Sequence, residues 1–415
     1  MKTRFYPCYL VLFFCLLPVF LLANPLKIKL GVDVFFEEGH HLLLKEKRVG
    51  LVTNQSGVDQ LLQPTSQLFL QNQDGFKLVA FFAPEHGITG ASYAGDIIED
   101  AEHHTSIPIY SLHGKTRRPT AKMLENVDVL IYDIQDIGVR SYTFSTTLYY
   151  LMEEAAKKQI EVIVLDRPNP INGLIVDGPM LNSKWRSFLG YINIPYCHGM
   201  TIGELAKYFN AEYDIGCKLK VIPMKGWKRS MTFRETGLTW IPPSPNIPEP
   251  DTPLYCASTG IMGELGIVNI GIGFTLPFKI IGAPWINAQA FSEKLNGQKL
   301  PGVYFLPFYY RPFYGSYKNQ ECQGVKIVVT DMRTYHPLSV QYLLIGMLKT
   351  LYSKEIKTQL AKVSVAQKNT FCKVNGNQEM FEWICKEKYV AWKMIQYQKE
   401  DRKNFLSTRK KYLIY

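Results

Sequence analysis

The clearest chemical signal in the 415-residue sequence is the carboxyl group of Glu85, in the segment Pro84-Glu85-His86-Gly87. This segment directly follows the apolar run KLVAFFA, so the carboxyl group is expected beside low-dielectric surroundings. Such surroundings raise the pKa of a carboxyl group toward the range that suits a general acid. The competing interpretation is a loop carboxylate that caps a following helix. The sequence therefore marks Glu85 as a candidate proton donor.

Two further polar segments follow apolar runs in the same way. Asp133, Gln135 and Asp136 come after VDVLIY, and Arg140 lies four residues beyond Asp136. Residues 166–170 (DRPNP) come after EVIVL, and their two prolines make a segment rigid enough to position a ligand. Ion-paired structural turns explain these residues at least as well, because Arg140 would neutralise an aspartate.

The residues give little support for a metal or a cofactor. The histidines at 40–41 and 103–104 are adjacent pairs, which do not share a helix or strand face, and His198 stands alone. The first expected strand is followed by Asn54-Gln55-Ser56-Gly57, which is not the glycine-rich dinucleotide fingerprint. There is also no Walker motif and no G-x-S-x-G elbow. We expect no metal site and no cofactor.

The elements that must position these residues alternate between strands and helices. Apolar runs bounded by turn residues predict strands buried on both faces, and such a pattern with intervening helices predicts an open parallel sheet. Ligands bind at the carboxyl ends of the strands in such sheets, so the polar loops should converge on one cleft. We predict strands at 48–53, 77–83, 107–110, 127–132 and 161–165, and helices at 60–71, 120–125 and 145–158.

The second half of the sequence has a different organisation. Thr201 and Glu204 form a capping box that begins a helix, and residues 240–253 (WIPPSPNIPEPDTP) predict a rigid strap. The aromatic-rich run 304–317 suits either sugar stacking or a core segment. A strand is expected at 325–330, with helices at 338–352 and toward the C-terminus. The fold class is therefore α/β, with a Rossmann-like parallel-sheet N-terminal domain (24–238) and a smaller α+β C-terminal domain (239–415).

Residues 1–23 are typical of a secretory signal, with Lys2 and Arg4 before an uncharged apolar stretch. An uncleaved membrane anchor is the alternative. Export would place the chain in the periplasm or outside the cell. Six cysteines follow the signal without C-x-x-C spacing, so their pairing cannot be deduced from the sequence.

The net charge of +11 raises the possibility of nucleic-acid binding. The excess is concentrated at the C-terminus, since residues 385–415 hold nine Lys or Arg against three Asp or Glu. The sequence contains no nucleic-acid recognition motif, so we expect no nucleic-acid partner. The composition is 47% hydrophobic, which excludes an intrinsically disordered chain.

Several of these segments, taken in order, resemble one known family. The strings are GLVTNQSGVD, FFAPEHGITG, YDIQDIGVRSYTF, VLDRPNPINGLIVDGPML, IPYCHGMTIGELA, PPSPNIPEPDT, IGAPW and FLSTRKKYLIY. The ordered set resembles the NamZ-type exo-β-N-acetylmuramidases, glycoside hydrolases that act on peptidoglycan fragments, over roughly residues 28–415. The resemblance implies an active cleft between two domains and release of terminal N-acetylmuramic acid from the non-reducing end. Peptidoglycan-derived glycans or muropeptides would be the partners, with no specific protein partner implied.

The resemblance also implies a set of site residues. Glu85 corresponds to the family's glutamate in PEHG and is the candidate acid/base. Glycoside hydrolysis needs a second carboxylate, for which Asp136, Asp166 and Glu264 all remain candidates. Arg140 or Arg167 would meet the lactyl carboxylate of a muramate. The positions carried over as cleft residues are Asn54, Gln55, His86, Gln135, Asp136, Arg140, Asp166, Arg167, Asn169, His198 and Asn246.

One segment departs from the family pattern. The family has a stretch like EGTNxSEGRGTxxPF, and the chain keeps its first glutamate as Glu264 but has Ile270 and Ile272 at the inner Glu and Arg. Replacing both members of a charged pair by apolar residues preserves folding but alters ligand contacts. The leading hypothesis is an exported exo-acting glycosidase. The alternative is a catalytically weak cell-wall glycan-binding protein with the same fold.

Overall fold

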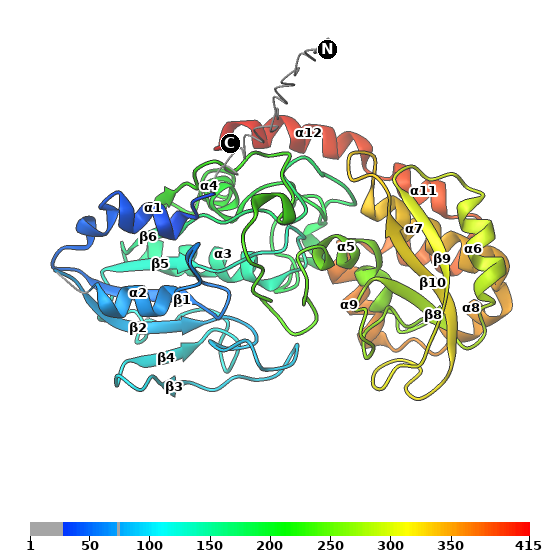
Figure 1. Ribbon diagram of the computed structural model, residues 1–415, viewed down its shortest axis with the longest axis horizontal. Helices are drawn as coiled ribbons and strands as arrows, with labels where there is room; N and C mark the ends of the chain where they lie inside the picture. Colours follow the sequence, from blue (N-terminus) through cyan, green and yellow to red (C-terminus); the bar gives the residue numbers. More distant parts are fainter. Residues whose placement is uncertain (1–27, 73–74) are drawn as a thin grey trace, which may run out of the picture.

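The computed structural model describes residues 28–72 and 75–415, which fold into two lobes (Figure 1). The first lobe is built on a seven-stranded sheet with the order β3-β4-β2-β1-β5-β6-β7. The neighbouring strands are parallel except that β3 pairs antiparallel with β4. The bounds are β1 Arg48–Thr53, β2 Lys77–Ala83, β3 Ala101–Glu102, β4 Pro108–Ser111, β5 Val129–Asp133, β6 Glu161–Leu165 and β7 Lys218–Ile222.

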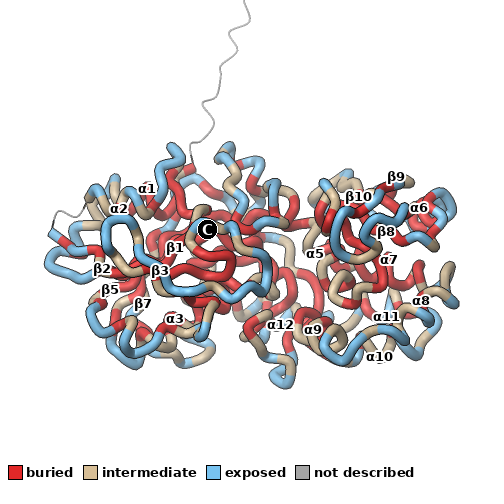
Figure 2. Tube along the Cα trace, turned by 90° about the horizontal axis from the view of Figure 1, so that it is seen from below, coloured by how far each residue is buried: buried red, intermediate tan, exposed pale blue. Residues whose placement is uncertain are grey.

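Helices cover both faces of this sheet because its central strands are apolar on both sides. Every residue of β5 is buried, and only the first residue of β1 is exposed. One face packs against α1 (Gly31–Glu37) and α2 (Thr65–Gln71), and the other packs against α3 (Thr143–Lys157) and α4 (Ile202–Glu212). Alternate strand residues enter the two cores, as the period of two along a strand requires. Figure 2 shows buried chain in this sheet and also inside the second lobe.

The strand order creates a crevice at the centre of the sheet. The chain runs outward from β1 through β2 to β4 and then returns to the other side of β1 as β5. Loops that follow neighbouring strands on either side of such a switch point diverge and leave room for a ligand. The registers Thr53↔Asp133 and Ala83↔Ser111 place the ends of four strands along one edge.

The second lobe combines a small antiparallel sheet with helices. The sheet has the order β8-β10-β9, from Ile280–Ala283, Cys322–Val329 and Val303–Tyr310. Its largest core includes residues from α5, α6 and α7 and also takes in Ile137 and Val139 of the first lobe, so the two lobes share buried contacts. The helices are α5 Thr252–Gly263, α6 Ala288–Asn296, α7 Pro337–Leu351, α8 Ser353–Leu360, α9 Val365–Asn375, α10 Glu379–Lys386 and α11 Ala391–Gln396.

The last helix, α12 (Lys399–Arg409), returns the chain to the first lobe (Figure 1). Phe405 is buried in the core that contains α3 and α4. Tyr415 packs against Trp227 with the rings 5.1 Å apart and nearly perpendicular. The predicted boundary between residues 238 and 239 stays a prediction, but the C-terminus lies on the first lobe in space.

Most predicted elements are confirmed, and so is the α/β fold class. The capping box of Thr201 and Glu204 begins α4 as expected. The helix expected at 120–125 is wrong, because residues 121–126 form turns, and the helix expected at 60–71 begins only at Thr65. Strands β3, β7, β8 and β9 were not predicted. β9 takes up the first half of the aromatic-rich run, with Phe305 and Tyr310 buried and Tyr304 and Tyr309 exposed.

Three further observations concern the cysteines, membrane-spanning helices and the predicted signal. The six cysteines of the described part are all free thiols. No helix within residues 28–72 and 75–415 is long and apolar enough to cross a membrane. The predicted signal at residues 1–23 lies outside the described residues.

Candidate active site

A cavity of about 410 Å³ lies between the two lobes, and we call it the interlobe cavity. From the first lobe it is lined by the loops after β2 and β5, and its other walls are the Pro-rich strap, α5, the loop 268–278 and the β9–β10 turn. Two carboxylates line it from opposite lobes, Glu85 and Glu264. Its volume lies in the range of about 300–1,000 Å³ that holds small ligands.

Glu85 is held in place by two hydrogen bonds. Its Oε1 accepts from the backbone N–H of Gly95 (3.0 Å), and its Oε2 accepts from the hydroxyl of Thr143 (2.7 Å) at the start of α3. The residue is only 9% exposed. The chain can turn here because His86 and Gly87 both have positive φ, and His86 Nδ1 lies 2.8 Å from the carbonyl of Ser92. The side chain is therefore fixed at the cavity wall.

His113 is a neighbour of Glu85 that sequence reasoning missed. Its Nε2 lies 3.6 Å from Glu85 Oε1, and its Nδ1 lies 3.0 Å from the carbonyl of Asp96, to which it donates. Burial lowers the pKa of His113 more than Glu85 raises it, so the ring is neutral and its Nε2 lone pair faces the carboxyl group. His113 follows β4 in the segment SLHG, so its strand-end position was the available signal.

Glu264 supplies the second carboxyl group of the cavity. It follows the last residue of α5, and burial raises its pKa to about 7. Within the described part of the chain, this carboxyl group makes no hydrogen bond or ion pair and faces the cavity free. It is therefore available to a ligand and exists in both protonation states near neutral pH.

Asp136 and His198 lie together beside the cavity wall formed by Ile137 and Val139. Burial raises the pKa of Asp136 to about 7 and lowers that of His198 to about 3. His198 Nδ1 accepts from the N–H of Met200 (3.2 Å), so its proton sits on Nε2, which lies 4.0 Å from Asp136 Oδ2. Asp136 Oδ1 has no hydrogen-bond partner among residues 28–72 and 75–415.

The amide residues after β1 and β5 form a network behind the cavity. Asn54 Oδ1 accepts from the N–H (2.9 Å) and hydroxyl (2.6 Å) of Ser56, and Ser56 Oγ accepts from the N–H of Gln135 (3.1 Å). The amide of Gln135 donates to two backbone carbonyls, and Gln55 donates to the carbonyl of Pro242 in the strap (2.8 Å). The strap thus covers these loops and leaves only a cleft of about 20 Å³ beside Gln135 and Arg167.

Comparison with known proteins supports the family resemblance. Residues 49–251 match the family model described as exo-β-N-acetylmuramidase NamZ, N-terminal, and residues 254–415 match its C-terminal counterpart. The chain belongs to the NamZ exo-β-N-acetylmuramidase family. The predicted resemblance and the predicted enzyme class, a glycosidase, are thereby confirmed.

Three relatives illustrate the similarity. The chain is 39% identical over 394 residues to the peptidoglycan β-N-acetylmuramidase NamZ of Bacillus subtilis, covering 95% of this chain and 92% of that protein. A crystal structure of a DUF1343 family protein from Bacteroides fragilis matches with a TM-score of 0.87 and 39% identity, covering 94% and 99% of the two chains. A second such protein from the same organism matches with a TM-score of 0.68 and 27% identity over the same shares.

The two arginines expected to meet a carboxylate in this NamZ-family chain are both engaged elsewhere. Arg140 is 1% exposed and donates to four backbone carbonyls, two of them across the lobe boundary at Val374 and Asn375. Arg167 forms a buried bidentate ion pair with Asp133, at 2.5 and 2.8 Å. Neither lines the interlobe cavity, so both hold the scaffold together in this structure.

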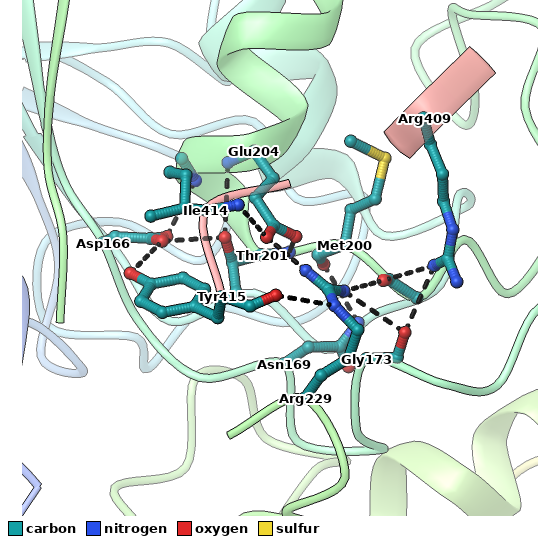
Figure 3. Close-up of polar contacts among 12 residues, drawn as sticks. Asp166, Asn169, Gly173, Met200, Thr201, Glu204, Arg229, Arg409, Ile414 and Tyr415 are labelled. Atoms are coloured by element: carbon teal, nitrogen blue, oxygen red, sulfur yellow. Dashed lines mark hydrogen bonds and ion pairs between the residues drawn. The ribbon is translucent and has the colours of Figure 1, made fainter. Parts of the chain in front are cut away.

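Asp166 and Asn169 also lie away from the cavity. Figure 3 shows Asp166 accepting from the hydroxyls of Thr201 and Tyr415, each at 2.7 Å, and its pKa is raised to about 7 mainly by burial. Asn169 donates to the carbonyl of Met200 (3.0 Å). Asp166 thus anchors the start of α4 and the C-terminus, which leaves Glu264 and Asp136 as the nearer candidates for the second carboxylate.

The remaining predicted residues do face the cavity. His86 lines it beside Glu85, and Asn246 lines it from the strap together with Ser244 and Ile247. Ile270 and Ile272, the positions that depart from the NamZ pattern, also form part of its wall. The sequence therefore identified the segment in which this chain's cavity differs from the family.

Proposed function

We propose that this chain is an exported exo-acting glycoside hydrolase that releases N-acetylmuramic acid from the non-reducing end of peptidoglycan fragments. The single observation that carries the proposal is the pairing of Glu85 and Glu264 across one interlobe cavity in a NamZ-family chain. Its relative in Bacillus subtilis is named a peptidoglycan β-N-acetylmuramidase. Glycosidases act through two such carboxyl groups on either side of the scissile bond.

Glu85 acts as the proton donor in this proposal. Its proton passes to the glycosidic oxygen as the bond from that oxygen to the anomeric carbon breaks. Water supplies the hydroxyl that the anomeric carbon gains, and the proton that this water releases restores the carboxyl group of Glu85 before the next turnover. Thr143 and Gly95 hold the carboxyl group in one orientation, which removes the cost of positioning it at each turnover. The neutral His113 beside it places no positive charge against the protonated form.

Glu264 is the group that stabilises the positive charge on the sugar or activates the attacking nucleophile. It faces the cavity from the opposite lobe, without a competing partner among the described residues. Its ionised form is the one required for this role, and its pKa of about 7 makes that form depend on pH. Asp136 supports the wall from behind, through Ile137.

The enclosure of the cavity favours attack at a chain end. The strap residues Ser244, Asn246 and Ile247 close one side of the space that Glu85 lines. Incubation with a defined muramic-acid-terminated tetrasaccharide, followed by mass spectrometry of early products, tests this. We expect free N-acetylmuramic acid and a trisaccharide. Disaccharide products would contradict the exo mode, and binding without any product would support the glycan-binding alternative.

Export is the second part of the proposal and rests on residues 1–23. Their basic start and uncharged apolar stretch are those of a signal peptide. Expression of the full chain in a bacterial host, followed by fractionation and intact-mass measurement, tests this part. We expect a periplasmic or secreted chain that has lost its first residues, and a full-length cytoplasmic chain would contradict the proposal.

A further inference from the structure

The interlobe cavity carries no cation to receive a negatively charged ligand. Its lining includes Glu85, Glu264 and His86, but no lysine or arginine among the residues that the structure describes. An N-acetylmuramic acid residue with a free lactyl carboxylate would add a third carboxyl group to this space. Like charges at such short range repel one another unless a cation or a proton separates them.

Three cations outside the lining, Arg140, Lys279 and Arg117, are committed to other partners. The Arg140 guanidinium donates hydrogen bonds to four backbone carbonyls, and Lys279 forms ion pairs with Glu249 and Asp251. Arg117 lies close enough to lower the pKa of His113, but its guanidinium stacks on the Phe188 ring at 4.4 Å. None of them therefore supplies the ion pair that a free lactyl carboxylate needs.

The wall that replaces the family's charged pair is apolar and rigid. Ile270 packs against Gly263, where an added Cβ would come within 2.3 Å of its Cδ1, and Gly263 directly precedes Glu264. The loop is fixed by Asn269, whose amide donates to the carbonyls of Ile272 (2.9 Å) and Ser316 (3.0 Å). Gly271, between the two isoleucines, has φ +83° and no room for a Cβ.

We propose that the cavity selects a muramic acid residue whose lactyl carboxyl group is uncharged because it is bound in an amide, as in a peptide-bearing muropeptide. The proposal rests on the muramidase function above. Ile270 and Ile272, which line the cavity, contact the lactyl methyl and the first peptide residue, so Glu264 stays free for its role at the anomeric carbon. A free lactyl acid loses the contact with the peptide residue and adds a charge that ionised Glu264 repels.

The test compares two chromogenic β-N-acetylmuramides that share one leaving group, one with a free lactyl acid and one with the lactyl group joined to L-alaninamide. We expect kcat/KM of the wild-type chain to be at least tenfold higher for the amide, which corresponds to about 1.4 kcal/mol. Ile272→Arg should raise kcat/KM for the free acid at least fivefold. Arg117→Ala, which alters the stacked cation outside the lining, should leave the ratio unchanged.

Calorimetric binding of the matching amide and acid disaccharides to Glu85→Gln separates the two proposals. Tighter binding of the amide supports the selectivity even if neither muramide is hydrolysed, in which case only the muramidase function fails. Equal or tighter binding of the acid, or a wild-type preference for the acid in turnover, overturns the selectivity and leaves the muramidase function standing.

Discussion

Replacing the final residue, Tyr415, by phenylalanine should destabilise the first lobe far more than a substitution at a chain end usually does. The Tyr415 hydroxyl donates to Asp166 Oδ2 (2.7 Å) and accepts from the N–H of Met224 (2.8 Å). Figure 3 shows this hydroxyl at the buried carboxyl group of Asp166, which also accepts a hydrogen bond from the hydroxyl of Thr201. The variant keeps the ring, and with it the contact with Trp227.

The magnitude follows from the two hydrogen bonds that are lost. A hydrogen bond to a buried carboxyl group contributes about 1.5–3 kcal/mol, and an unpaired buried N–H adds roughly 1 kcal/mol. Asp166 keeps three other donors, from Thr201, Gly203 and Arg167, which limits the loss. We therefore expect Tyr415→Phe to lower the free energy of unfolding by about 2–4 kcal/mol.

Urea unfolding followed by tryptophan fluorescence measures this change, with Trp227 as the reporter beside the Tyr415 ring. Tyr412→Phe is the matched control, because that hydroxyl bonds the exposed Glu212 at the surface. We expect the control to change stability by no more than about 0.5 kcal/mol. Equal midpoints for the two variants would refute the view that the Tyr415 hydroxyl anchors the C-terminus to the first lobe.

Three other outcomes follow from buried charges. Burial raises the pKa of Asp136 to about 7, so its contribution to the free energy of unfolding is fully present below about pH 4 and is lost as the pH rises through 7. In urea unfolding, the stability of Asp136→Asn minus that of the wild-type chain should therefore be about 2 kcal/mol more favourable at pH 8 than at pH 4. If the ionised form of Glu264 is the active one, kcat/KM of the wild-type chain should rise as the pH increases through about 7. The kcat/KM of Glu264→Gln should show no such rise and should be at least about 100-fold lower. Arg140→Met should lower the free energy of unfolding by about 3–5 kcal/mol because it leaves four buried carbonyls unpaired, whereas Arg333→Met, at a side chain 89% exposed, should change it by less than about 0.5 kcal/mol.

Strand-end chemistry was readable from the sequence because it depends on local pattern. An apolar run followed by a polar loop placed Glu85 correctly at the edge of a parallel sheet, and the departure at residues 270 and 272 pointed to the cavity wall. The placement of Glu85 needs only the periodicity of buried strands and the position of their ends, whereas the departure at residues 270 and 272 was read from the family resemblance.

The hydrogen-bond partners of the buried cations could not be predicted from the sequence, because each cation and its partners lie far apart along the chain. Arg140 bonds carbonyls 234 and 235 residues away, and the strap carries Pro242 to Gln55 across 187 residues. A guanidinium near a strand end looks the same in sequence whether it binds a ligand or backbone carbonyls. His113 was missed for the complementary reason, since only the fold brings β4 and β2 side by side.

The central claim is that Glu85 donates the proton to the leaving group, and leaving-group dependence tests it most directly. We compare wild-type chain, Glu85→Gln and the exposed control Glu102→Gln on lactyl-amidated muramides with a methylumbelliferyl or a dinitrophenyl leaving group. Glu85→Gln should lose at least about 100-fold in kcat on the first substrate but far less on the second, whose leaving group needs no proton, while the control matches wild type. Full turnover of the methylumbelliferyl substrate by Glu85→Gln would contradict the claim.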